Sequence, residues 1–182
     1  MKIDYTIDEN DFLIYQLFTA SKSPNITKTR KMSKFRLPIF LIIIGVLFYF
    51  LTQIWYYLIF CSIFGLFWLL FFPKWEKIYY KKYFQKYIQE NFSNIFGKTI
   101  TLELTNDFLF SKQKGYENKI MTSELKEITE IPSLILIKLS NGEYLIIPKN
   151  QIPDIKLLKS HLQELASYIN IDYSVNNNWK WR

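Results

Sequence analysis

The chain has 182 residues, a length that accommodates one globular domain or a membrane segment with one small domain. It carries 23 Lys and Arg against 16 Asp and Glu, but the charges of residues 91–182 almost balance, which argues against a nucleic-acid partner. The chain has a single cysteine, Cys61, and therefore cannot form an internal disulfide. It has one histidine, His161, and a lone histidine in a helical pattern is more often packed or exposed than bound to a metal.

The first 36 residues predict a strand, a helix and a basic linker. Apolar and polar residues alternate over Met1–Ile7, which is the period of a half-buried strand. Apolar residues then recur at helical spacing over Asp8–Ser21, and Thr6 with Glu9 fits a capping box at the start of that helix. The helix dipole explains the carboxylates of the first turn, so they do not indicate an acid–base or metal cluster. Residues 21–33 are polar and basic and are expected to be a linker.

The stretch Leu37–Phe72 is uncharged and almost wholly apolar. A helix needs about 20 apolar residues to cross a bilayer, so this stretch is long enough for two crossings. We expect helices over Leu37–Gln53 and Trp55–Phe72, joined at residues 52–54, with Pro38 suited to the first helix start. A signal peptide would begin earlier and be shorter, and a soluble core hairpin would keep a polar face, which neither half has.

Basic residues flank this apolar stretch on both sides, whereas the predicted turn carries no charge. Because Lys and Arg are retained on the cytoplasmic side, we expect a multi-pass protein of the inner (plasma) membrane with both termini cytoplasmic. The same residues are candidate membrane-surface contacts that would form a cationic collar against anionic lipid headgroups of the bilayer. The alternative is that they set the topology and do nothing further. The candidates are Lys28, Arg30, Lys31, Lys34, Arg36, Lys74, Lys77, Lys81 and Lys82.

Residues 74–96 predict an amphipathic connecting helix, because aromatic rows and lysine-rich rows alternate around it. The helix could lie in the headgroup region, or it could continue the second crossing and pack its aromatic face on the following domain. We favour the second arrangement for the distal half. The aromatic rows are Tyr80, Phe84, Ile88 and Phe92, and Trp75, Tyr79, Tyr83 and Tyr87.

Residues 97–169 predict a small antiparallel β-sheet or barrel capped by a C-terminal helix. Strands are expected at 99–105, 108–112, 117–122, 125–131, 134–139 and 143–147, and the helix at 155–169. Asn141-Gly142 is the strongest hairpin signal. The N-terminal strand can add to this sheet, whereas the Asn-rich tail is expected to be weakly ordered. The expected fold class is thus α+β with a transmembrane helical hairpin, divided into residues 1–36, 37–73, 74–96, 97–169 and 170–182.

The order of these parts, together with several short motifs, resembles a known family. The motifs are Tyr79–Phe84, Gly97–Leu102, Leu139–Gly142 and Ile146–Lys149. They are similar to the bacterial YcxB-like proteins. The resemblance implies a pleckstrin-homology-like (PH-like) C-terminal domain of unassigned function, with no catalytic residues to transfer. Inositol phosphate binding does not follow from it, because only Lys112 and Lys114 lie on a strand-linking turn.

The chain has no motif of a nucleotide, metal or nucleophile site, so we expect neither an enzyme nor a cofactor. Ser160, His161 and Glu164 are neighbours on one predicted helix and do not make a positioned triad. The favoured function is a membrane-anchored binding module that presents the PH-like domain at the inner membrane face. The alternatives are an immunity protein that protects against a membrane-acting toxin, and a regulatory subunit of another membrane protein.

Overall fold

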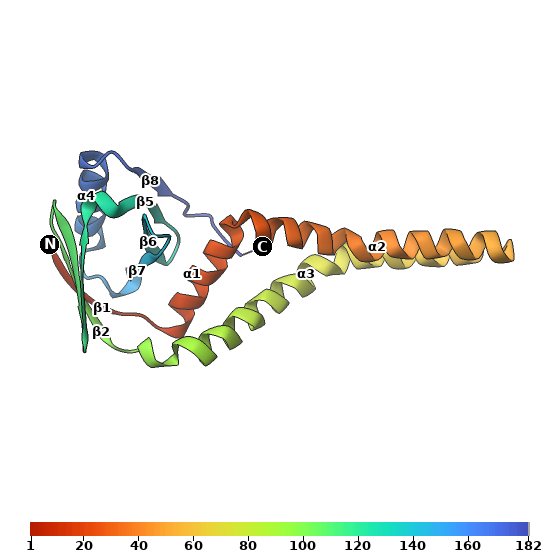
Figure 1. Cartoon of the computed structure of the whole chain (residues 1–182), viewed down its shortest axis with the longest axis horizontal. Coiled ribbons are helices and arrows are strands. Elements are labelled where there is room, and N and C mark those ends of the chain that lie inside the picture. Colours follow the sequence, from red (N-terminus) through yellow and green to blue (C-terminus); the bar gives the residue numbers. More distant parts are fainter. Residues whose placement is uncertain (182) are drawn as a thin grey trace. The chain divides into compact units, whose positions relative to one another are not determined.

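The computed structural model describes residues 1–181, and the chain divides into two compact units. Residues 1–16 and 85–180 form the first unit, and residues 17–84 with Trp181 form the second. The first unit holds strands β1–β8 and helix α4, and the second holds most of the two long helices α2 and α3 (Figure 1). The structure is α+β, as the sequence predicts.

The strands of the first unit form two four-stranded sheets. One sheet has the order β1-β2-β3-β4 and the other the order β7-β6-β5-β8, and in the described residues they are not joined into a closed barrel. All pairings are antiparallel except that of β5 with β8. The strands are β1 (Lys2–Thr6), β2 (Thr99–Leu104), β3 (Phe108–Gln113), β4 (Tyr116–Met121), β5 (Leu125–Glu130), β6 (Leu134–Leu139), β7 (Tyr144–Pro148) and β8 (Asp172–Val175).

Segments from both ends of the sequence contribute strands. β1 pairs with β2, so the predicted addition of the N-terminal strand to the sheet is confirmed. The prediction of a weakly ordered tail is wrong for residues 172–175, because β8 pairs in parallel with β5. After α4, Asn170 adopts a left-handed conformation with φ of 57°, and the Ile171 N–H donates to the Ala166 carbonyl oxygen. This turn directs the chain back to the sheet edge.

The core of the first unit combines residues of both sheets with α4 (Ile155–Tyr168). This helix starts at Asp154, whose Oδ1 accepts a hydrogen bond from the Leu157 N–H at 3.0 Å. Residues 134–137 of β6 are buried on both faces of the sheet, which explains their continuous apolar sequence. Leu102, Leu104, Leu136, Ile146, Leu158 and Leu162 are buried, and Ile100 is half-buried.

Helix α1 (Glu9–Lys22) begins with a capping box of Asp8 and Asp11, not of Thr6 and Glu9 as predicted. The Asp8 Oδ1 accepts from the Asp11 N–H at 2.7 Å, and the Asp11 Oδ2 accepts from the Asp8 N–H at 3.4 Å. Thr6 is unavailable for this role because its N–H and hydroxyl both donate to Gln151 Oε1, at 2.7 and 2.9 Å.

The polar segment before the apolar stretch is helical, so the predicted linker over residues 21–33 is wrong. Helix α2 (Pro24–Thr52) has Ser23 as its N-cap, which accepts a hydrogen bond from the Ile26 N–H at 3.4 Å, and Pro24 in its first turn. Pro38 lies inside this helix rather than at a helix start. A basic sequence without glycine is compatible with a helix, and the Ser23 cap supplies its beginning.

Helix α3 (Tyr56–Phe92) runs through Pro73, so the second apolar segment and the predicted connecting helix are one helix. The turn before it falls at Gln53, where the sequence predicts it, and this residue has φ of 60°. α2 and α3 approach closely at Gly45, where an added Cβ would lie 3.0 Å from the Cys61 Cβ. Short 3-10 turns lie at Ser93–Ile95, Thr122–Glu124 and Lys149–Gln151.

Candidate functional site

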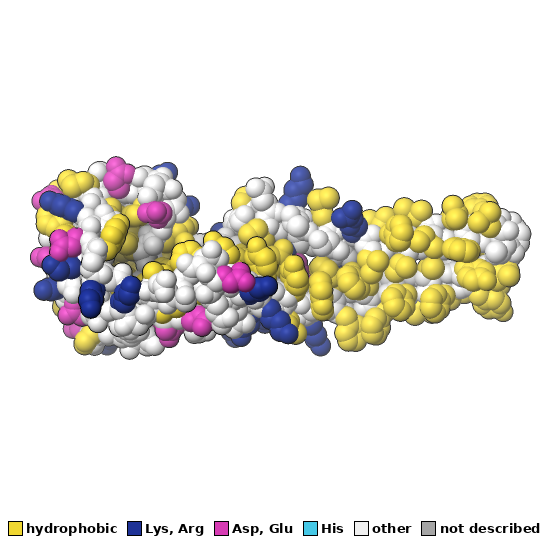
Figure 2. Space-filling view, turned by 60° about the horizontal axis from the view of Figure 1, so that its bottom comes forward, with side chains coloured by type: hydrophobic (Ala, Val, Ile, Leu, Met, Phe, Trp, Pro, Cys, Tyr) yellow, Lys and Arg dark blue, Asp and Glu magenta, His cyan; other side chains and the backbone are white. Residues whose placement is uncertain are grey.

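The apolar parts of α2 and α3 are exposed along most of their length. Both helices are long and apolar enough to cross a membrane, and only 11% of the apolar window of each is buried. Figure 2 shows hydrophobic side chains covering this part of the second unit, and Leu51 and Leu70 are 73% and 74% exposed. A core helix of a soluble protein would be mostly buried. A large exposed apolar surface of this kind is typical of a segment that contacts a partner or a bilayer.

The predicted membrane-surface cations lie at the end of these helices that is remote from the turn at Gln53. Because α2 and α3 are antiparallel, the cations before the apolar part of α2 and those after the apolar part of α3 come to the same end. A cavity of about 270 Å³ between the helices has Arg30 and Lys34 on one side and Glu76 on the other, which shows that the two segments are neighbours. The exposed cations are Lys28, Lys31, Arg36, Lys74, Lys77, Lys81 and Lys82, and Lys34 is half-buried.

Arg30 differs from the other cations and belongs to an internal cluster rather than to the surface. Its Nη2 donates to Glu76 Oε2 at 3.1 Å, and its Nε lies 3.1 Å from Glu76 Oε1, without the alignment of a hydrogen bond. The guanidinium lies 4.5 Å from the ring centroid of Trp181 and 5.7 Å from that of Tyr80. We call Arg30, Glu76, Tyr80 and Trp181 the Arg30 cluster.

The sequence offers only a partial signal for the Arg30 cluster. Glu76 is the first acidic residue after Asp11 and stands among lysines. A single carboxylate in a basic segment indicates an ion pair, but it does not identify the partner. Trp181 follows an Asn-rich segment and has no such sign. In the structure it is buried, and its indole N–H donates to the Lys77 carbonyl oxygen at 3.4 Å.

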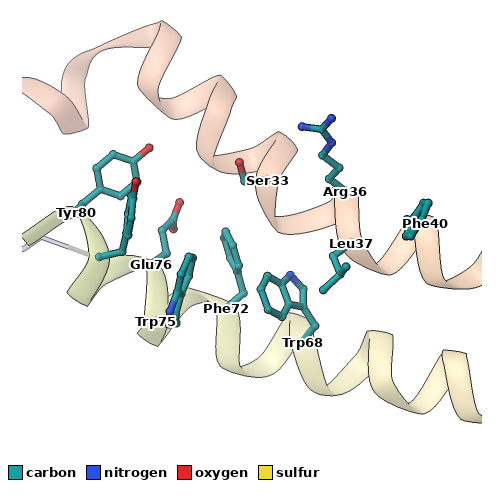
Figure 3. Close-up of a pocket in the computed structure, with 10 residues that line it drawn as sticks. Ser33, Arg36, Leu37, Phe40, Trp68, Phe72, Trp75, Glu76 and Tyr80 are labelled. Atoms are coloured by element: carbon teal, nitrogen blue, oxygen red, sulfur yellow. The ribbon is translucent and has the colours of Figure 1, made fainter. Parts of the chain in front are cut away.

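A groove of about 590 Å³ lies between α2 and α3 beside the Arg30 cluster (Figure 3). Phe40 and Trp68 line one end, and Glu76 and Tyr80 line the other. Arg36 also lines the groove from α2, and in Figure 3 its guanidinium is directed away from α3. The buried Trp68 Nε1 has no hydrogen-bond partner among the described residues. The remaining lining residues are Ser33, Leu37, Phe72, Trp75 and Tyr79.

The first unit contains a separate buried polar cluster around Glu130. Its Oε1 accepts from Lys149 Nζ at 2.8 Å and from Lys159 Nζ at 2.5 Å, and its Oε2 accepts from the Tyr173 hydroxyl at 3.3 Å. Burial by itself raises the pKa of Glu130, but the two ammonium groups outweigh burial and hold that pKa below its ordinary value. Burial, reinforced by the Glu130 charge, raises the pKa of Tyr173 to about 12. The cluster joins β5, α4 and β8, which is a structural role.

Ser160, His161 and Glu164 are all exposed, and the Ser160 Oγ donates to the Glu164 Oε1 at a long 3.4 Å. Over residues 1–181, no group of three or more His, Cys, Asp and Glu residues could hold a metal ion.

The structure defines an α+β protein with two long, exposed, apolar helices. Residues 104–162, which run from the end of β2 into α4, match the sequence model of the family described as YcxB-like protein. The resemblance indicated by the sequence motifs is confirmed over these residues. No curated protein and no solved structure matches the chain.

Proposed function

We propose that the chain is a membrane-anchored, non-enzymatic binding module. In this proposal α2 and α3 cross the inner membrane as a hairpin, both termini are cytoplasmic, and the first unit is presented at the cytoplasmic face. The observation that carries the proposal is the exposed, uncharged surface of residues 37–72 with cations at one end only. Each exposed Leu or Phe that leaves water for lipid contributes roughly 1.5–3 kcal/mol, which favours insertion.

The charge distribution supports the orientation. The turn around Gln53 carries no Lys, Arg, Asp or Glu, so its transfer across the bilayer moves no charged side chain. The opposite end carries the cations on both helices, and placing one Lys or Arg at the bilayer centre costs about 2.5–3.5 kcal/mol on insertion scales. Retention of this end on the cytoplasmic side follows from the same rule.

The strand order supports a PH-like assignment of the first unit. β2, β3 and β4 form one antiparallel meander, β5, β6 and β7 form a second, and α4 follows them in the chain. Two meanders and a C-terminal helix are the arrangement expected of a PH-like domain. This is an argument by fold analogy, which favours a binding role over catalysis without naming a ligand.

The insertion part of the proposal is tested by fractionating cells that express the full chain. We expect the protein in the membrane fraction, resistant to alkaline carbonate. Replacing Ile43 and Leu66, which are exposed within the two apolar segments, by Arg should move the protein out of this fraction. The matched variant Leu157→Arg places a charge on the exposed face of α4 and should leave the protein there. Release of the unaltered chain by carbonate would contradict insertion.

A further inference from the structure

Strand β8 differs from the other strands of the first unit in how it joins its sheet. It follows α4 in the chain and pairs in parallel with β5, whereas the other described pairings are antiparallel. The pairing joins Asp172–Val175 to Glu127–Glu130, and the Asn176 N–H extends it by donating to the Glu130 carbonyl oxygen at 2.7 Å. β5 therefore presents one edge to β6 and the other edge to a segment of the C-terminal tail.

The core of the first unit contains no buried side chain from β8. Within residues 1–181, the buried residues of this core come from β1 to β7, from Ile152 and from α4. Tyr173 packs against the core from a half-buried position, and Asp172 and Val175 are exposed. Because buried core residues hold one another through their mutual contacts, the core does not depend on β8.

The polar side chains at this edge of β5 have partners besides β8. Thr129 and Glu130 are buried, at 2% and 4% exposure. The Thr129 hydroxyl lies 3.1 Å from that of Ser174, but it also donates to Glu127 Oε1 at 2.8 Å. Glu130 accepts from the Tyr173 hydroxyl at 3.3 Å, and its two shorter bonds, to lysines, do not involve β8. Departure of β8 would therefore leave neither side chain as an unpaired buried polar group, which would be costly.

The groups of β5 that depend on β8 are those of the main chain. An edge strand without a neighbour presents a row of unpaired N–H and C=O groups, which is a template for an added strand. Strand addition uses these groups for affinity and the side chains of the added strand for specificity. Tyr173 and Ser174 are the half-buried positions of β8, opposite Ile128 and Thr129. This edge thus favours an extended segment with hydroxyl-bearing side chains at two consecutive positions.

We infer that the β5 edge is a binding surface for an extended segment of a partner protein, and that β8 is the chain's own occupant of this surface. The partner segment pairs in parallel with residues 127–130 and presents a Tyr followed by Ser or Thr, the side chains that β8 places there. This inference rests on the proposed binding role and deepens it by naming the surface and the class of partner. Because the tail is tethered beside the edge, at an effective concentration on the order of millimolar, a partner has to compete with β8.

The test removes β8 from the edge and supplies the same strand as a peptide. Ser174 lies two residues before Asn176, so its N–H is on the same side of the strand, and Ser174→Pro deletes this donor. The probe is a fluorescein-labelled peptide with the sequence of residues 170–178, and its binding to the purified full chain in detergent is followed by fluorescence anisotropy. We expect Ser174→Pro to bind the peptide at least about tenfold more tightly than the unaltered chain, whose edge is occupied.

Matched controls separate strand pairing from other effects. Asn177→Pro places a proline at an exposed position of the tail outside β8, so this variant should bind the peptide as weakly as the unaltered chain. A peptide that carries Ser174→Pro should not bind to the Ser174→Pro chain, because it cannot complete the ladder. A peptide that carries Tyr173→Phe lacks the hydroxyl that contacts Glu130 and should bind about three- to tenfold more weakly.

The outcomes distinguish this surface from the membrane function. Absence of peptide binding to a folded Ser174→Pro chain would overturn the surface, and so would unfolding of this variant in circular dichroism, because the core has to persist without β8. A dimer of the unaltered chain that exchanges its tails would overturn a partner protein as the occupant. None of these results affects insertion, which the carbonate extraction tests. Carbonate release of a chain that binds the peptide would overturn insertion and leave the surface.

Discussion

Replacing Glu76 by Gln tests whether the Arg30 cluster holds the basic ends of α2 and α3 together. The side chains of Arg30 and Glu76 are 21% and 9% exposed, so the substitution would leave a largely buried guanidinium without its carboxylate. Removal of one partner of a buried ion pair costs about 3–5 kcal/mol. Because Arg30 keeps some contact with water and keeps the Trp181 ring at 4.5 Å, we expect a loss of about 2–3 kcal/mol.

The measurement is the free energy of unfolding of the purified chain in detergent, followed by tryptophan fluorescence. The double variant Arg30→Met with Glu76→Gln removes both charges and should recover most of the lost stability, because no unpaired charge remains. Glu90→Gln is the matched control, since its pair with Lys86 is 3.8 Å long and both side chains are mostly exposed. It should change the stability by less than about 0.5 kcal/mol. Equal effects of Glu76→Gln and Glu90→Gln would refute the role of the cluster.

Three further predictions concern the first unit. Leu102→Ala removes a fully buried side chain and should cost about 2–5 kcal/mol in thermal or denaturant unfolding, whereas Leu157→Ala, at a 48% exposed position, should cost little. The ionised Glu130 stabilises the fold at pH values above its ordinary pKa of 4.5, and this stability is lost as the pH falls through the lower pKa of the folded state. Glu130→Gln should therefore have a smaller free energy of unfolding than the unaltered chain at pH 7, and this free energy should fall less on acidification. Burial raises the pKa of Asp11 from 3.8 to about 6, so ionisation of this carboxyl lowers the stability of the fold as the pH rises through that interval. An NMR titration should give a midpoint near 6, and Asp11→Asn should remove this part of the pH dependence of the free energy of unfolding.

The sequence predicts the elements whose periodicity is long and unbroken. The uncharged run of residues 37–72 indicates two helices, and the amide of Gln53 indicates the turn between them. The apolar run of β6 and the Asn141-Gly142 turn indicate one hairpin with the correct partners. In each case one local feature determines the structure, either the spacing of the apolar residues or the residue types in the turn.

Features that depend on partners distant in sequence could not be predicted. The strand β8 forms because β5 offers it an edge, and Asp172–Val175 alone is too short to signal a strand. Trp181 becomes buried because Arg30 of α2 and Tyr80 of α3 provide a cationic and aromatic surface. Residues 21–33 looked like a linker because their composition is polar, but Ser23 and Pro24 begin a helix that continues into the apolar stretch.

The most direct test of the central claim is cysteine accessibility in living cells. Cys61 is the only cysteine, so a Cys61→Ser background allows single reporters to be placed at two exposed positions, Gln53→Cys in the turn and Ser160→Cys on α4. A membrane-impermeant maleimide applied outside the inner membrane should label Gln53→Cys in intact cells and label Ser160→Cys only after the membrane is permeabilised. Labelling of Ser160→Cys alone in intact cells would reverse the topology, and equal labelling of both positions before and after permeabilisation would contradict a membrane-spanning hairpin.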